Sequence, residues 1–327
     1  MENTSKWRYG VNRWIILLLV FLAIVAANTF IPIRPTILVA PEPISEQPLF
    51  TLPVIGDFYV TNTLTSMLLV DLIIILIALV VRNATRKGDL VPSGFAGAVE
   101  AAVEAMYNLT ESTAGRWTRI VFPWFATIMI VVLVSNLLGL IPGMESLGSL
   151  TSAHGDHGYD KVTLIPGLLG GIVKPAEGTE GQYYVVPWFR GMSTDLNFTA
   201  ALALISVIAT QIIGFRVQGI RYLSKFFNFT TLFKKPFFGA IDFAVGLLEL
   251  ISEFSKILSF TFRLFGNMFA GMVLLFLVSS MLPWFFPSLV MTFEFFIGLI
   301  QAFVFGMLTM VFMSQATQGH GDSHEEQ

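Results

Sequence analysis

Residues 264–316 read LFGNMFAGMVLLFLVSSMLPWFFPSLVMTFEFFIGLIQAFVFGMLTMVFMSQA, and Glu294 is the only formally charged side chain among them. A membrane-spanning helix needs about 20 mostly apolar residues, so this stretch is long enough for two. Pro283 and Pro287 interrupt it, and proline in a helix interior removes a hydrogen-bond donor and clashes with the preceding turn. The stretch therefore predicts two membrane helices arranged as a hairpin.

The composition of the whole chain also indicates a bilayer. Of its 327 residues, 54% are hydrophobic and 13% are charged, and the mean hydropathy is +0.73. Soluble domains carry about 25% charged residues, so ordinary soluble globular domains are excluded. The net charge of −3 indicates no nucleic-acid partner, and the lack of cysteine excludes disulfides and thiolate metal sites.

Further charge-poor stretches extend the membrane prediction. They are residues 14–30, 58–81 (interrupted by Asp71 alone), 120–144 and 196–215. With the hairpin they predict an all-α polytopic membrane protein of five or six membrane helices. The first stretch allows a second interpretation, since a basic start, an apolar core and Val25-Ala26-Ala27 could form a cleaved signal peptide of residues 1–27.

Lysine and arginine residues orient these helices. They cluster in residues 82–119 and 216–236, whereas residues 31–57 contain only Arg34. Because cytoplasmic loops carry the excess of basic residues, the N-terminus, both basic connections and the C-terminal tail are predicted to be cytoplasmic. Within the first basic connection, residues 94–115 have apolar positions at helical spacing and glutamates on another face, which predicts an amphipathic helix on the cytoplasmic surface.

A stripe of polar residues lies in the otherwise apolar segment 241–269. Its members follow at steps of three or four residues and so share one helix face: Glu249, Glu253, Lys256, Ser259, Arg263 and Asn267. Ion pairs on a surface helix explain the first three residues as well as a functional role does. They do not explain Arg263, because no charge follows it for 30 residues and a guanidinium stays protonated at any depth. We therefore expect Arg263 to be a fixed cation in a polar pathway, the alternative being a side chain that reaches the membrane interface.

Glu294 is the matching feature of the returning helix. Gln301 lies two helical turns further on the same face, and Gly298 and Gly306 would let another helix approach closely. A glutamate at the edge of a water-filled cavity can exchange protons, so Glu294 is a candidate proton carrier. An interhelical hydrogen bond would explain Gln301 as well as a functional role does.

These strings resemble subunit a of the bacterial F-type ATP synthases. The resemblance rests on LSFTFRLFGNMFAG (258–271) and LIQAFVFGMLTMVFMSQA (299–316), and is supported by SNLLGLIPG (135–143), STDLNFTAALAL (193–204) and LLELISEFSKILSF (247–260). It implies a membrane domain over residues 58–316. Within this domain, the polar, glycine-rich composition of residues 143–192 indicates a loop insertion. Residues 1–57 would be an extra membrane helix (or signal segment) and an extracytoplasmic linker, and residues 317–327 a disordered acidic tail. The resemblance also implies that the C-terminal hairpin is long and tilted and lies against a rotating ring of c subunits.

The resemblance assigns roles to individual residues. Arg263 matches the family's essential arginine, Asn267 its helical neighbour and Gln301 the glutamine opposite. Ser259, Lys256 and Glu249 match polar positions upstream. The family also uses a titratable pair at positions that here hold Met272 and Glu294, so one half of the pair is missing. Gly139 stands where some relatives have aspartate, and Asp71, taken as a buried acid, could compensate.

The implied function is proton translocation through two offset half-channels, with Arg263 between them. The resemblance implies as partners the c ring, b-type stator subunits, other ATP synthase subunits and the lipid bilayer. It implies a bacterial cytoplasmic (inner) membrane, no catalytic step in this chain and no cofactor. Whether the ion is H⁺ or Na⁺ stays open, because the ion-binding carboxylate is on the ring.

Two other classes of protein fit the composition. A self-contained ion channel or secondary transporter would also explain charges at membrane depth. An intramembrane hydrolase would need paired acids, a Ser–His pair or a metal motif at depth, yet all four histidines fall in the 143–192 loop or the tail. The sequence HGDHGYD (154–160) could bind a metal, but a polar loop explains it better.

Overall fold

The computed structural model describes residues 13–14, 17–18, 40–45, 47–53, 56–86, 94–152, 159–165, 169–173, 183–220, 222, 236–281 and 285–318. The described helices are α2 (Asn62–Thr85), α3 (Phe95–Ala114), α4 (Thr118–Gly139), α5 (Leu196–Gln218), α7 (Pro236–Met281) and α8 (Phe286–Thr317). Five stretches of this described part are long and apolar enough to cross a membrane, which confirms an all-α polytopic membrane protein. Most of the predicted first span (14–30), of the HGDHGYD motif and of the tail lies outside the described residues.

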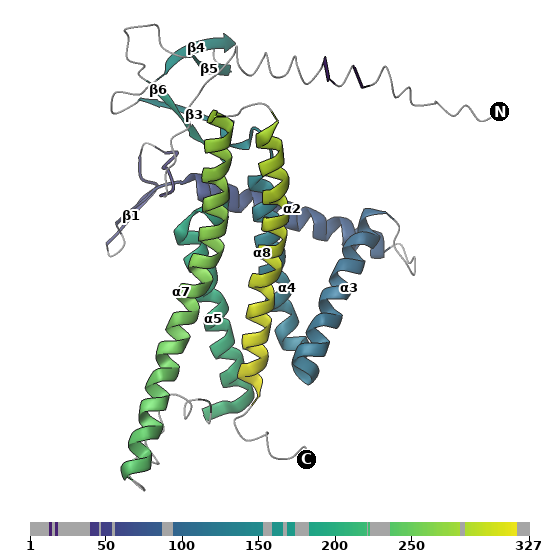
Figure 1. Cartoon of the computed structure of the whole chain (residues 1–327), viewed down its shortest axis with the longest axis vertical. Helices are drawn as coiled ribbons and strands as arrows, with labels where there is room; N and C mark the ends of the chain where they lie inside the picture. Colours follow the sequence, from purple (N-terminus) through teal and green to yellow (C-terminus); the bar gives the residue numbers. More distant parts are fainter. Residues whose placement is uncertain are drawn as a thin grey trace, which may run out of the picture.

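Helix α8 packs against α4, α5 and α7 (Figure 1). Buried side chains of α3, α4, α5 and α8 form one apolar cluster that includes Phe125, Ile213 and Met313. A second cluster joins α7 to these helices through Phe260 and Phe305, whose rings lie 5.0 Å apart. Since lipid is as apolar as a side chain, close packing rather than exclusion of water holds such helices together.

Glycines on α8 permit this packing, as the sequence predicted. A Cβ on Gly298 would lie 3.2 Å from Cβ of Asn136, and one on Gly306 would lie 2.9 Å from Cβ of Met129 and 3.1 Å from the ring of Phe125. All three neighbours belong to α4. The spacing of the two glycines therefore keeps the backbone of α8 close to α4 along two turns.

Replacing Gly306 with leucine should separate α4 from α8. Because the new side chain has no room beside Met129 and Phe125, we expect a loss of about 1–3 kcal/mol of stability. The measurement is thermal unfolding of the detergent-solubilised complex. Phe303→Leu, on the exposed face of the same helix, is the matched control and should unfold like the wild type. Equal stability of the two variants would contradict the packing described here.

The lengths of α7 and α8 determine how they lie in a bilayer. The apolar part of α7 alone, Phe243–Ser279, has 37 residues and is about 55 Å long, whereas the hydrocarbon core is about 30 Å thick. Helix α2, with 24 residues, matches that thickness and runs across the view in Figure 1, while α7 and α8 run along its vertical axis. With α2 along the membrane normal, α7 and α8 would be strongly tilted, and the tilt of the hairpin stays a prediction.

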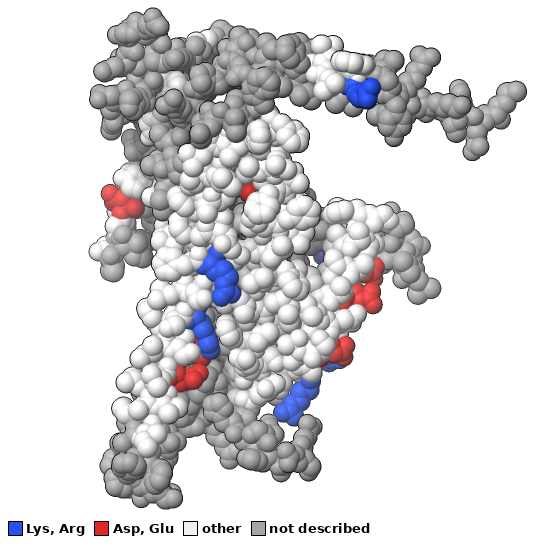
Figure 2. Space-filling model, viewed as in Figure 1, with Lys and Arg blue, Asp and Glu red and all other residues white. Residues whose placement is uncertain are grey.

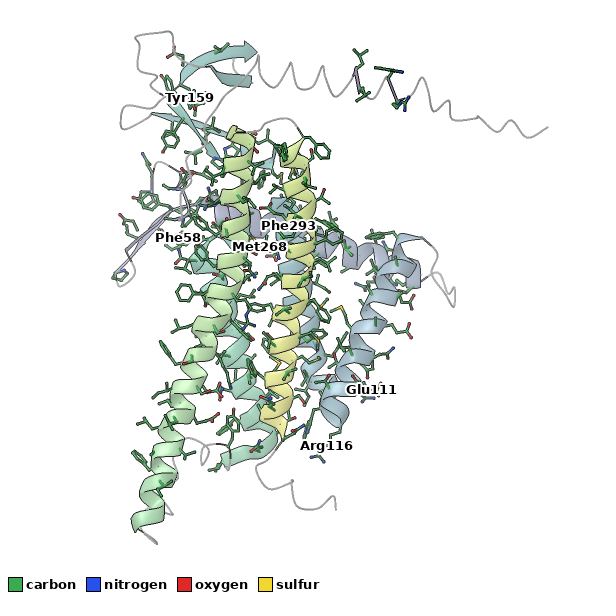
Figure 3. All side chains as sticks on the ribbon, in the orientation of Figure 1. Phe58, Glu111, Arg116, Tyr159, Met268 and Phe293 are labelled. Carbon is green, nitrogen blue, oxygen red and sulfur yellow. The ribbon has the colours of Figure 1, made fainter. Side chains whose placement is uncertain are left out.

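Helix α3 has the two faces expected of a surface helix. Ala96, Met106, Thr110 and Ala114 are buried against the bundle, while the three glutamates of this helix are exposed. Figure 2 shows acidic side chains along its outer edge, and Figure 3 places Glu111 and Arg116 at its far end. Its amphipathic character is therefore confirmed.

The predicted span of residues 120–144 is too long at its end. Helix α4 ends at Gly139, where a Cβ would lie 3.1 Å from Cα of Gly191. Gly143 then adopts a φ of +86° that favours glycine. The charge-free run continues to Met144, but a close backbone contact and a turn end the helix earlier.

The predicted span of residues 58–81 is shifted instead. Helix α2 begins at Asn62, because residues up to Phe58 pair as strands, and the Thr61 side chain caps it by accepting a hydrogen bond from the Leu64 amide at 3.4 Å.

Short strands, which the sequence did not predict, lie around one end of the bundle, with β3 to β6 at that end and β1 at the side (Figure 1). They are β1 (Phe50–Leu52), β2 (Gly56–Phe58), β3 (Gly148–Ser152), β4 (Asp160–Ile165), β5 (Leu169–Val173) and β6 (Tyr183–Pro187). They form antiparallel pairs β1–β2, β3–β6 and β4–β5. Figure 3 labels Tyr159 at this end and Phe58 at the side of the bundle, at about the level of Met268. The described part of the loop insertion (143–192) thus contains two antiparallel strand pairs, β3–β6 and β4–β5.

Candidate functional site

The antiparallel contact between α7 and α8 brings the two sets of polar residues together. Asn267 of α7 donates a hydrogen bond from Nδ2 to Oε1 of Gln301 on α8 at 2.7 Å. One turn further along α7, Gly271 faces the carboxyl group of Glu294, with a position for Cβ 3.1 Å from its Cδ. The stripe of α7 and the polar face of α8 therefore form one site. Figure 3 labels Met268 and Phe293, the neighbours of Asn267 and Glu294, close together on the two helices.

Arg263 lies partly exposed on α7, four residues before Asn267. Its guanidinium donates to Oγ of Ser259 at 3.3 Å, and no carboxylate of the described residues forms an ion pair with it. The residues beside it include Phe262, which is 56% exposed. A permanent cation on an apolar face, held by one long hydrogen bond, is available to an anion brought by another molecule.

Two residues near the start of the stripe, Glu253 and Lys256, form an ion pair with each other. Lys256 donates to Glu253 at 2.8 Å and lies 4.7 Å from the ring centre of Phe312. Glu253 is only 8% exposed, however, so this ion pair is not the exposed one that a surface helix would have. Glu249 lies one turn earlier on α7. Figure 2 shows blue and red side chains following one another along α7 on a face that is otherwise uncharged.

A cavity of about 670 Å³ opens between α5 and α7 at the level of Glu253. Gln211 of α5 and Glu253 of α7 border it, but the accessible lining is almost entirely apolar and comes from side chains such as Val207 and Phe254. Nε2 of Gln211 is buried and has no hydrogen-bond partner in the described part of the chain, while its Oε1 accepts from Tyr222. This cavity adjoins the stripe on the side away from Glu294.

Glu294 is 7% exposed, and its Oε1 has no hydrogen-bond partner among the described residues. A buried carboxyl group without a partner is costly unless a second molecule or water satisfies it. With 1.5 Å per residue, Arg263 lies about 12 Å along α7 from the level of Gly271 and Glu294, and about 15 Å from Glu253. Arg263 is therefore roughly midway between two acidic regions.

A series of hydrogen bonds between polar groups extends from α8, the helix that carries Glu294, into the bundle. Asn136 of α4 donates from Nδ2 to the Gly298 carbonyl at 3.0 Å and accepts at 2.6 Å from Ser193, which lies in the short helical turn η3 (Met192–Thr194). We did not predict roles for Asn136 and Ser193, although both belong to the strings SNLLGLIPG and STDLNFTAALAL. Both are polar residues within quoted family strings, and this combination could have identified them from the sequence.

Known proteins match most of the length of this chain. The sequence profile described as ATP synthase A chain matches residues 63–314. This chain belongs to the ATP synthase A chain family. It is 30% identical to ATP synthase subunit a 1 of Pelobacter propionicus over 242 residues, which cover 74% of this chain and 82% of that protein. It is 29% identical to ATP synthase subunit a of Helicobacter pylori strain G27 over 270 residues, or 81% of this chain and 92% of the relative.

Membership of the ATP synthase A chain family makes two departures from the expected residues informative. Met272 cannot carry a proton, so the titratable pair expected from the resemblance is incomplete beside Glu294. Gly139 occupies a position where a Cβ would lie 3.1 Å from Cα of Gly191, so an aspartate would require the backbone at Gly191 to move by a few tenths of an ångström. Met272 and Gly139 therefore leave Glu294 without the titratable partners that the resemblance implies.

The sequence led us to expect Asp71 as a buried acid that compensates for the missing partner of Glu294. Its side chain is exposed on α2 instead of buried, and no hydrogen bond or ion pair links it to Glu294 within the described residues. The prediction of a buried acid was wrong because a charge-poor stretch does not reveal which face of a helix packs against the bundle. Val70, next to it, occupies the buried face.

A cluster of charges that sequence reasoning missed lies near the strands. Arg190 is 8% exposed and donates to the Ala40 carbonyl at 3.0 Å and to Oγ1 of Thr194 at 3.2 Å. Its guanidinium interacts electrostatically with Glu145, Asp195 and Glu42. Burial raises the pKa of the Glu145 carboxyl group, and the charge of Arg190 partly opposes that increase. These residues are separated in sequence, so their meeting depends on the folding of the 143–192 insertion.

Proposed function

We propose that this chain is the proton-translocating stator subunit of an ATP synthase and forms two offset half-channels against a rotating c ring. Arg263, a cation with no ion-pair partner among the described residues, carries the proposal. It lies on the partly exposed side of α7, between Glu294 and Glu253. A deprotonated carboxylate on the ring is the anion that such a cation would attract at membrane depth.

The outer half-channel contains Glu294. Its buried carboxyl group receives a proton from the extracytoplasmic side and passes it to the ring carboxylate near Asn267 and Gln301. The neutralised ring carboxyl group then leaves Arg263 and enters the lipid. Rotation through nearly a full turn brings it to the other side of Arg263.

The inner half-channel is the region of Glu249, Glu253 and the cavity beside Gln211. Here the ring carboxyl group releases its proton to the cytoplasm, and the charge of Arg263 favours the deprotonated state. Since Arg263 lies between the two regions, a proton cannot pass directly. A membrane potential adds about 2.3 kcal/mol per charge for each 100 mV.

The wider assembly belongs to the same proposal. The chain would hold the ring together with b-type stator subunits in a bacterial cytoplasmic membrane, with its C-terminus in the cytoplasm. The nucleotide chemistry would take place in other subunits, and this chain would perform no catalytic step. The basic connections 82–119 and 216–236 support this orientation.

Proton flux in liposomes separates this function from that of a stand-alone channel or transporter. The purified chain alone should conduct no more protons than empty liposomes, because each half-channel ends at the level of Arg263. Adding the c ring and the b-type subunits should produce flux under a potassium diffusion potential. Proton flux through the chain alone would instead indicate a self-contained channel or transporter.

A further inference from the structure

The pair of titratable groups that the resemblance implies is incomplete at Glu294, which makes another titratable group near it worth identifying. Glu294 is 7% exposed, its Oε1 has no hydrogen-bond partner in the described part, and Met272 cannot exchange a proton with it. Asp71 is exposed on α2 and is not joined to it. A second titratable group would therefore come from an element other than α2 and α7.

Glu145 has the position required of that group. It lies in the turn η2 (Met144–Ser146), directly after the end of α4, and is partly buried. Its negative charge acts on the carboxyl group of Glu294, which places the two carboxyl groups within electrostatic reach across the α4–α8 contact. Asn136, near the end of α4, is already bonded to the Gly298 carbonyl one turn from Glu294.

Arg190 holds the other side of Glu145. The guanidinium is 8% exposed, is anchored on Thr194 and the Ala40 carbonyl, and interacts with Glu145 and with Glu42. The strands of the 143–192 insertion lie at this same end of the bundle (Figure 1). Glu145 is therefore between a charged cluster on the loop side and the buried Glu294.

We propose that Glu145 is the second proton-carrying carboxyl group of the outer half-channel, relaying protons between extracytoplasmic water and Glu294 in place of the group that Met272 lacks. The inference rests on the proposed function of the chain. Four charged groups define its surroundings. Arg190 acts on Glu145, Glu145 in turn acts on Glu294, and Glu42 and Asp195 act on Arg190.

The relay conserves protons and charge. A hydronium ion from the outer water gives its proton to the Glu145 carboxylate, forming an O–H bond and leaving water. That O–H bond then breaks, and the proton moves along a water molecule to the Glu294 carboxylate, where a new O–H bond forms. Glu145 is again a carboxylate, and Arg190 stabilises that charge until the next proton arrives.

The test uses the assembled ATP synthase reconstituted in vesicles, with ATP-driven proton pumping as the readout. Glu145→Gln removes the titration and should slow pumping about tenfold or more, which is the low end of a proton-transfer contribution. Asp57→Asn, an exposed acid on β2, is the matched control and should pump at the wild-type rate.

Glu145→His distinguishes a proton relay from an ion-pair partner of Arg190. Imidazole titrates near neutrality but brings no negative charge. A relay predicts that Glu145→His keeps within about threefold of the wild-type rate. A purely structural partner of Arg190 predicts that His is as harmful as Gln. If Glu145→Gln does not assemble, the comparison of Glu145→His with the wild type decides.

A second-site change gives an independent measurement. Met272→Glu in the Glu145→Gln background restores an acid on α7 next to Gly271, which already faces Glu294, and should recover most of the lost rate. Wild-type pumping by Glu145→Gln, with an inactive Arg263→Ala, would overturn the relay and leave the proposed function intact. Normal pumping by Arg263→Ala would overturn the proposed function itself.

Discussion

Replacing Arg263 with alanine should abolish ATP-driven proton pumping and ATP synthesis while the complex still assembles. The side chain has one hydrogen bond of 3.3 Å and no ion pair among the described residues, so its removal costs little folding free energy. Its loss removes the only fixed cation between Glu294 and Lys256 on this face. We expect a decrease of about 100-fold or more, comparable with the removal of a charge-stabilising group from an active site.

Lysine should not replace Arg263 well. An ammonium group lacks the planar arrangement of donors and can lose its proton when it is desolvated. Pumping and synthesis by reconstituted Arg263→Lys should therefore remain far below the wild-type rates. Amounts of assembled complex in the membrane serve as the control for both variants. Coupled synthesis at the wild-type rate by Arg263→Ala would contradict the role given to this residue.

Replacing Glu294 with glutamine should sharply slow proton uptake from the outside. Glutamine preserves the shape of the side chain beside Gly271 but cannot carry a proton. The expected loss is about 100-fold, the usual range for removing a positioned proton-transfer group. Glu294→His should keep part of the rate, because imidazole exchanges protons near neutral pH. Pumping and driven synthesis in vesicles measure both variants.

Asp71→Asn is the matched control for Glu294→Gln. It removes an acid from a membrane helix, but the side chain is exposed on α2, so the effect should be much milder. If Glu294→Gln pumps normally and Asp71→Asn does not, the outer entrance has been assigned to the wrong carboxyl group.

The sequence predicted those parts of the fold that depend on local patterns. The charge-free runs located the membrane helices, and Pro283 and Pro287 indicated the break that lies between Met281 and Phe286. The step of three or four residues placed Arg263 and Asn267 on one face, and Gly298 and Gly306 do face α4. Each of these features follows from residues close together in the chain.

Features that depend on distant residues were not predictable in this way. The exposed position of Asp71 follows from the packing of its neighbour Val70, which lies on the buried face of α2, against α4 and η3. The early end of α4 follows from the contact of Gly139 with Gly191. The approach of Glu145 to Glu294 depends on the fold of the insertion. No periodicity in the sequence brings such pairs together.

The most direct test of the central claim measures passive proton flux through the reconstituted membrane sector with the ring locked to a b-type stator subunit by a reducible cross-link. The charge of Arg263 is proposed to separate two half-channels, so that protons pass only when the ring turns. The wild-type sector should conduct after reduction of the cross-link and stop conducting when locked, whereas locked Arg263→Ala should leak protons. Undiminished flux through the locked wild-type sector, or a locked Arg263→Ala sector as tight as the wild type, would contradict the account.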